Sequence, residues 1–320
     1  MSPKIVTVVG ATGAQGKGVV RGFINNPAYK VRTITRNPSS AAAKALADQG
    51  AEVVAADLDD LASLKTAFAG SHIIFGVTDF FAPFIAHQSP EKAMDVEEQQ
   101  GINLARAAAA TSTLEHYIWS TLPNSEALSN NKFLVPHFSG KNRIDKYIRT
   151  QEPALLAKTT FLFVTWYHSN YSFPVFRPVH VPIADKQVLI GAYDPTTPIQ
   201  TIGDVSVNLG AFVRAAVEQP EKTLGGKTVL AAIETHAAAE QFALWAKAKG
   251  KQAQYLKIDG QAYRELWPLW GEEMGVMMDF WEWARENSWT LPGGEKVVGR
   301  EELGITGVQS LEEAYKGYEL

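Results

Sequence analysis

The sequence has no cysteine among its 320 residues. That absence excludes disulfide bonds, a thiol nucleophile and a zinc site with cysteine ligands. There is also no apolar run of the roughly 18 residues that a membrane-spanning helix needs, no internal repeat and no low-complexity segment. Lys and Arg number 30 against 34 Asp and Glu, for a net charge of −4. Nucleic-acid-binding proteins are commonly basic, so we expect neither direct nucleic-acid binding nor membrane association.

The length accommodates one large or two modest domains with a sizeable core. A cysteine-free chain fits the cytosol. The N-terminus leads directly into the first predicted strand and leaves no room for a signal peptide. We expect a cytoplasmic protein, with the nucleus as a second compartment.

The most informative pattern is the glycine-rich stretch Gly10-Ala-Thr-Gly-Ala-Gln-Gly16, between a β-branched apolar strand and a predicted helix. This arrangement is typical of a pyrophosphate-binding turn, because the first N–H groups of the helix and its dipole attract an anion. Gly10 allows the tight turn, Gly13 lets the backbone approach phosphate, and Gly16 is expected to let the helix pack closely on the sheet. The spacing is G-x-x-G-x-x-G, so the flanking strand and helix carry the prediction.

The second predicted strand, residues 29–36, indicates which nucleotide binds. An NAD site places Asp or Glu about 20 residues after the glycines to bind the ribose 2′-hydroxyl. This chain has Arg36 there, and no carboxylate lies between Gly10 and Arg36. A guanidinium group suits a 2′-phosphate, so we predict NADP(H) as the cofactor. The alternative is an arginine that is merely solvated.

Strand and helix patterns alternate along the first half of the chain. Strands are predicted at residues 4–9, 29–36, 51–57, 71–78, 115–121 and 159–165, with helices between them and a further helix and strand at 204–218 and 227–233. Alternation at this spacing predicts an α/β protein: a doubly wound parallel-sheet Rossmann domain with a smaller, mainly helical C-terminal domain. We assign residues 1–166 plus about 203–233 to the first, and about 167–202 plus 234–320 to the second. Ligand is expected at the strand ends: Thr12, Arg36, Asp57, Thr78, Ser120 and Thr165.

Three segments fall outside that alternation. Residues 79–90, rich in Phe and Pro, are predicted as a loop. Five prolines within residues 167–202 argue against a central strand or a long helix there. Five tryptophans between Trp267 and Trp289 predict the core of a small domain, or alternatively an aromatic wall over a flat apolar ligand.

Residues 137–141, His-Phe-Ser-Gly-Lys, are the candidate catalytic motif. Short-chain dehydrogenases place a Tyr-x-x-x-Lys pair on the helix after the fifth strand, and here the lysine is kept and the tyrosine is replaced. Lys141 is a candidate ribose contact or proton donor. His137 titrates in a useful range for proton transfer, although a cationic neighbour disfavours imidazolium, and local packing at the helix start is the alternative. Ser120 is the third catalytic candidate, as a hydroxyl that orients substrate.

In these motifs the chain resembles the NmrA-like family, atypical relatives of the short-chain dehydrogenases and reductases. The matching stretches are Gly10–Gly16, Val31–Pro38, Gly50–Val54 with Asp57, Val77-Thr78, His137–Lys141 and Trp166–Asn170. The resemblance covers about the first 170 residues and implies preferential NADP(H) binding. It implies contacts from Thr12, Gly13, Gln15, Gly16, Arg36, Asn37, Asp57, Leu58, Thr78, Lys141, Tyr167 and Asn170.

The resemblance leaves two functions open. One is a redox sensor or regulator whose conformation or protein partner depends on the bound cofactor, as the missing tyrosine favours. The other is an NADPH-dependent reductase that uses Lys141 on a bulky aromatic or conjugated carbonyl, imine or olefin. The sequence alone slightly favours the sensor, because it identifies no certain proton donor.

Overall fold

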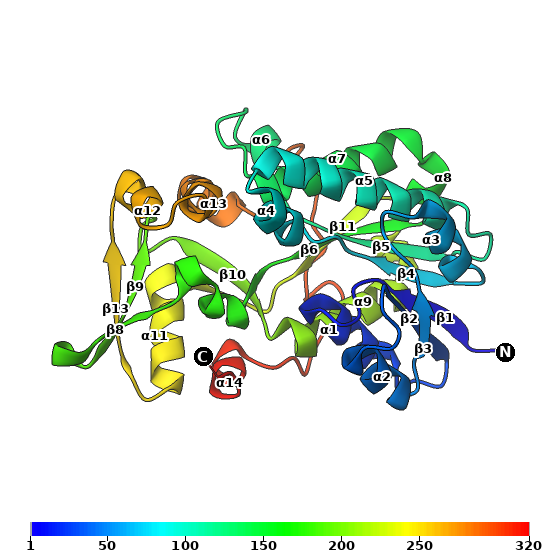
Figure 1. Ribbon diagram of the computed structural model, residues 1–320, viewed down its shortest axis with the longest axis horizontal. Coiled ribbons are helices and arrows are strands. Elements are labelled where there is room, and N and C mark those ends of the chain that lie inside the picture. The colour runs from blue at the N-terminus through cyan, green and yellow to red at the C-terminus, as the bar shows by residue number, and fades with distance from the viewer. Residues whose placement is uncertain (1, 320) are drawn as a thin grey trace.

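The computed structural model describes residues 2–319 and has a seven-stranded sheet at its centre (Figure 1). Every neighbouring pair in it is parallel, in the order β11-β6-β5-β4-β1-β2-β3. The strands are β1 (Lys4–Val8), β2 (Tyr29–Thr35), β3 (Glu52–Ala55), β4 (Ile73–Gly76), β5 (His116–Thr121), β6 (Thr159–Val164) and β11 (Lys227–Ala231). The order reverses between β1 and β4, which is where sheets of this kind bind ligands.

Helices cover both faces of this sheet (Figure 1). One face carries α1 (Ala14–Phe23), α2 (Ala41–Asp48) and α9 (Val205–Glu218); the other carries α3 (Leu61–Phe68), α5 (Pro90–Ala109), α7 (Pro136–Gln151) and α8 (Pro153–Leu156). Phe23 and Phe212 are fully buried on the first face, and Leu104 and Ile144 on the second. Strands buried on both faces require the near-continuous apolar runs that the sequence has. The predicted doubly wound Rossmann fold is confirmed.

The rest of the chain forms two three-stranded sheets and several helices. The sheets have the orders β12-β10-β7 and β13-β9-β8. Their strands are β7 (Trp166–Tyr167), β8 (Val179–Val181), β9 (Lys186–Gly191), β10 (Pro198–Gly203), β12 (Glu234–Ala237) and β13 (Gln252–Lys257). The remaining helices are α4 (Phe81–His87), α6 (Ser125–Leu128), α10 (Pro220–Thr223), α11 (Ala238–Ala248), α12 (Gly260–Leu266), α13 (Trp270–Ala284) and α14 (Leu311–Lys316). Between residues 2 and 319, no helix combines the length and apolar character needed to cross a membrane.

The proline-rich region departs from its prediction, because β9 and β10 are the middle strands of the two small sheets. The prediction of no central strand there was wrong. Pro198 is the first residue of β10, a position where a missing N–H costs the ladder little. The other prolines lie in the connections, so the strands between them remain intact.

The segment predicted as a loop after β4 contains the helix α4. Asp79 accepts a hydrogen bond from the backbone N–H of Phe81 at 2.9 Å, and Pro83 falls in the first turn of the helix, where N–H groups have no intrahelical acceptor. Gln88 ends the helix in the left-handed conformation. A Phe- and Pro-rich run is therefore compatible with a two-turn helix when its proline comes early.

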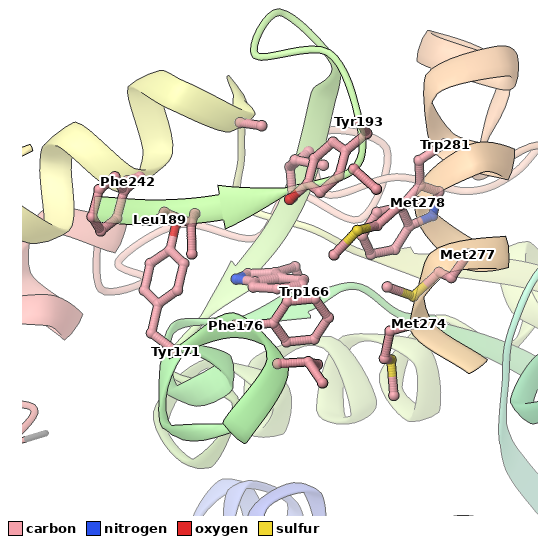
Figure 2. Close-up of a cluster of buried hydrophobic side chains, with 14 of the residues drawn as sticks. Trp166, Tyr171, Phe176, Leu189, Tyr193, Phe242, Met274, Met277, Met278 and Trp281 are labelled. Atoms are coloured by element: carbon pink, nitrogen blue, oxygen red, sulfur yellow. The ribbon is translucent and has the colours of Figure 1, made fainter. Parts of the chain in front are cut away.

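Most of the tryptophan-rich tail is core. Trp281 and Trp289 are each 5% exposed, whereas Trp283 is exposed. Figure 2 shows Trp281 among the methionines of α13 and close to Trp166 and Phe176. None of the five tryptophans between residues 267 and 289 lines the large cavity described below, so this cluster belongs to the interior of the smaller sheets and helices.

Candidate functional site

A cavity of about 690 Å³ lies at the carboxyl ends of the central strands, within the usual size range of ligand sites. It begins at Arg36 and Asn37 after β2 and passes the glycine turn after β1. It then continues past Thr78 to an end lined by Phe80, Phe81, Leu122 and His137. The cavity therefore spans the point where the strand order reverses.

The glycine turn has the shape that an anion needs. Gly10 has φ +66°, which favours glycine, and a side chain at Gly16 would place its Cβ 2.2 Å from the carbonyl oxygen of Gly10. Gly16 therefore lets α1 approach the backbone of the turn that follows β1 closely, and its role in packing the helix on the sheet itself stays a prediction. Gly13 is the N-cap of α1, with no side-chain cap and no acidic residue in the first turn. The first N–H groups of α1 are free to bind a pyrophosphate.

Arg36 lies at the edge of the cavity beyond β2 and is exposed. Within residues 2–319 its guanidinium group makes no ion pair and no hydrogen bond with the protein. Beside it, the Asn37 side chain accepts hydrogen bonds from the backbone and hydroxyl of Ser39 at 3.1 and 2.7 Å, which shapes the loop. Asp57 and Leu58 line the adjoining wall. The arginine is thus a cation available to a ligand.

Gln15 joins three parts of the site. Its amide N–H₂ donates to the Tyr167 hydroxyl at 2.7 Å, and its amide oxygen accepts from the Ser120 hydroxyl at 2.7 Å. Burial raises the pKa of Tyr167 to about 12, against a smaller opposing effect of the hydrogen bond from Gln15. The start of α1, the end of β5 and the end of β7 are connected through this one amide.

Lys141 is buried and fully engaged by the protein. Its ammonium donates to Glu97 Oε1 at 2.7 Å, to the Thr78 hydroxyl at 3.0 Å and to the Thr78 carbonyl at 3.1 Å. Glu97, on α5, is 0% exposed and also accepts from the Thr78 hydroxyl at 2.8 Å. The lysine has three N–H donors, and all three have acceptors here. Its positive charge is therefore held at the end of β4.

His137 is held from outside the central sheet, by Glu273 in the first turn of α13. Glu273 Oε1 lies 2.5 Å from His137 Nδ1 and accepts the backbone N–H of His137 at 3.1 Å. The two residues are 6% and 1% exposed, and Glu273 Oε2 is buried without a hydrogen-bond partner. The same carboxylate oxygen thus binds the ring of His137 and one of the open N–H groups at the start of α7.

A third carboxylate, the partly buried Asp145, lies on α7 behind the cavity wall. Asp145 accepts from Trp119 Nε1 at 2.7 Å and from the Thr121 hydroxyl at 2.8 Å. Burial raises its pKa to about 7, although these hydrogen bonds act in the opposite direction. Asp145 does not line the cavity, so it fixes the end of β5 from behind.

The structure brings most of the predicted site residues to this one cavity. Its walls include Gly10, Thr12, Gly13, Gln15, Gly16, Arg36, Asn37, Asp57, Leu58, Thr78, Ser120, His137, Lys141 and Tyr167. Asn170, in the 3₁₀ segment His168–Ser172, and Thr165 do not line it. Sequence reasoning missed Glu97 and Glu273, because no local motif marks an acid whose partner is 44 or 136 residues away.

The parallel sheet, its strand order and the glycine turn define a Rossmann-fold protein of the dinucleotide-binding type. The chain belongs to the NmrA-like family, which it matches over residues 2–292.

Named relatives include an NmrA-like family domain-containing oxidoreductase of Aspergillus hancockii, 34% identical over 180 residues. That match covers 55% of this chain and only 50% of the relative, so the chain spans about half the relative's length. Among solved structures, NmrA, a negative transcriptional regulator, has been determined with NADP and with NAD. The NADP complex has a TM-score of 0.72 at 20% identity and covers 99% of this chain and 95% of that one. An NADPH-dependent quinone oxidoreductase of Escherichia coli, complexed with NADPH, has a TM-score of 0.65 at 19% identity, with 97% and 98% covered.

Proposed function

We propose that this chain is an NADPH-dependent reductase of flat aromatic or conjugated carbonyl compounds, or of imines and olefins of that shape. The observation that carries the proposal is the far end of the cavity. Phe80, Phe81 and Leu122 line the cavity together with His137, and the ring centroids of Phe80 and Phe81 lie 6.0 and 5.5 Å from that of the imidazole. This aromatic part of the wall suits a flat ligand. The oxidoreductase name of the Aspergillus relative and the quinone oxidoreductase of similar fold support the same chemistry.

The glycine turn and Arg36 are the residues that would hold the cofactor. The open N–H groups of α1 would bind the pyrophosphate, and the guanidinium group of Arg36, which has no protein partner within residues 2–319, would bind the ribose 2′-phosphate. When bound, the nicotinamide supplies a hydride. The buried Lys141 then contributes its positive charge near the developing oxyanion and keeps Thr78 in place.

The experiment is a calorimetric titration of the purified protein with NADP⁺, NADPH, NAD⁺ and NADH, followed by an assay of NADPH oxidation against a panel of quinones and aromatic enones. NADPH deuterated at C4 of the nicotinamide should pass its label into the product. Tight NADPH binding without label transfer to any member of the panel would refute the reductase.

A second candidate is the redox sensor, which the Gln15 contacts favour. The Gln15 amide lies at the start of α1 and binds the Tyr167 hydroxyl at the end of β7. A cofactor bound at α1 would thereby influence the sheet that contains β7 and β10. A sensor must bind NADP⁺ and NADPH with different affinities, because equal affinity shifts no conformational equilibrium. The same titrations measure that difference.

Replacing Arg36 with alanine should weaken NADP⁺ and NADPH binding about ten- to hundredfold, the effect of losing a charge-assisted contact of roughly 1.5–3 kcal/mol. NAD⁺ and NADH binding should change less than about twofold. Lys44→Ala is the matched control, because Lys44 is an exposed cation on α2 that does not line the cavity. Equal weakening of both cofactor pairs by Arg36→Ala would show that Arg36 does not bind the 2′-phosphate.

A further inference from the structure

Glu273 fixes both the orientation and the tautomer of His137. A carboxylate oxygen only accepts hydrogen bonds, so Nδ1, at 2.5 Å from Glu273 Oε1, carries a proton and donates it. The bond from the His137 backbone N–H to the same oxygen ties the ring to the start of α7. The rings of Phe80, Phe81 and Phe138, with centroids 6.0, 5.5 and 4.8 Å from the imidazole, surround it.

The second ring nitrogen is left for a ligand. His137 lines the substrate end of the cavity, and its Nε2 has no hydrogen-bond partner within residues 2–319. A charged imidazole would carry a proton on this nitrogen. An acidic N–H at the end of the cavity is what a carbonyl oxygen would meet.

The donors of Lys141, Ser120 and Thr121, which also line the cavity, already have acceptors. All three N–H groups of Lys141 have acceptors, and the hydroxyl of Ser120 donates to Gln15. Thr121 donates to Asp145. Burial raises the pKa of Tyr167 to about 12, which makes its phenol a weaker acid. His137 is the remaining candidate.

We propose that His137 Nε2 donates the proton in the reduction and that Glu273, from α13, is the positioning residue that holds His137 in the required tautomer and charge. This inference rests on the proposed reductase function and assigns the donor that replaces the missing tyrosine.

The proposed reduction of a carbonyl substrate conserves atoms, electrons and charge. Hydride from the bound cofactor adds to the carbonyl carbon, the π pair moves to oxygen, and the Nε2–H bond of the imidazolium breaks as the new O–H bond forms. His137 is left neutral, with its Nδ1 proton still bound to Glu273, and takes its next proton from water. The net change is carbonyl plus NADPH plus H⁺ to alcohol plus NADP⁺.

Donation from Nε2 requires the doubly protonated ring, whose charge the neighbouring charged groups influence. The charged groups around the imidazole come from its own helix and from each element packed against it. They are Glu273 on α13, Lys141 with its partner Glu97 on α5, Asp79 before α4, and Glu126 of α6, which accepts from Ser139 at 2.6 Å.

The test has two measurements. Nitrogen NMR of ¹⁵N-histidine-labelled protein is recorded with NADP⁺ present and no substrate, and steady-state kinetics are measured separately. His137→Asn identifies the His137 signals. In Glu273→Gln the amide oxygen can still accept both hydrogen bonds but carries no charge. We expect the His137 titration to move to lower pH in this variant and kcat at pH 7 to fall at least tenfold. In His137→Asn we expect kcat to fall about a hundredfold or more. NADPH affinity should stay within twofold in both.

The matched control is Glu272→Gln, because Glu272 is the exposed neighbour on α13 and pairs with Arg264. This variant should change neither the His137 titration nor kcat. His137→Gln serves as a second variant if His137→Asn does not fold. An unchanged His137 titration in Glu273→Gln would overturn the role of Glu273, and an unchanged kcat in His137→Asn would overturn the role of His137. Absence of label transfer by the wild-type protein would instead overturn the reductase function, and proton donation with it.

Discussion

Replacing Glu97 with alanine is expected to lower the free energy of unfolding by about 3–5 kcal/mol, the usual cost of removing one partner from a buried ion pair. Glu97 is 0% exposed and Lys141 only 7%. Without the carboxylate, the ammonium stays buried with only the two oxygen atoms of Thr78 as acceptors. Urea denaturation measures the loss as a lower midpoint at constant slope.

The control is the double variant Glu97→Leu/Lys141→Met, which removes both charges and retains apolar volume. Apolar replacement of a buried pair is often neutral or stabilising, so this variant should recover most of the lost stability. We expect it to bind NADP⁺ and to reduce substrate poorly, since the charge near the oxyanion is gone. A loss below about 1 kcal/mol in Glu97→Ala would mean that the pair is solvated in solution.

The cofactor half of the cavity is largely predictable from the sequence because its parts are local. The glycine turn follows its strand directly, and Arg36 comes at the end of the next strand. In a parallel sheet those two ends necessarily meet at one edge. The right-handed crossover rule narrows the possible strand orders, and the order itself comes from the structure.

The substrate half is not predictable in this way. Glu97 and Glu273 reach Lys141 and His137 from α5 and α13, and nothing within a few residues of either acid marks a partner. His137 by itself could be a packing residue at a helix start. The tertiary contact with Glu273 fixes the ring and leaves Nε2 without a partner within residues 2–319, and these two observations support the proposal that His137 is the donor.

The sequence did not predict the two small sheets, because their strands also depend on contacts between distant parts of the chain. Pro198 begins β10 and forms only a terminal pair with Ala237, so its missing N–H falls at the end of the ladder. The number of prolines in residues 167–202 does not show where in a strand each proline falls. The strands depend instead on partners such as β12 and β13, which lie more than 30 residues further along the chain.

Replacing Gly16 with alanine should abolish measurable cofactor binding, with at least a hundredfold loss of NADP⁺ affinity, and should destabilise the protein. The added Cβ would lie 2.2 Å from the oxygen and 2.5 Å from the carbon of the Gly10 carbonyl, and 2.6 Å from the Cα of Ala11. All three are backbone atoms of the turn, so no side-chain rotation relieves the contact. The turn must open, which displaces the N–H groups that face the pyrophosphate.

Helix propensity alone makes the opposite prediction for Gly16→Ala. Gly16 lies within α1, where alanine is favoured over glycine by about 1 kcal/mol. A decrease in stability therefore cannot arise from propensity and must come from the contact with the turn. Gly13→Ala is the matched control: its Cβ would lie 3.3 Å from the Gly10 oxygen, and Gly13 has φ −83°, which alanine adopts freely. That variant should keep the wild-type free energy of unfolding within about 1 kcal/mol. If Gly16→Ala instead gained stability and bound NADP⁺ as tightly as wild type, the turn would not pack against α1 as the structure has it.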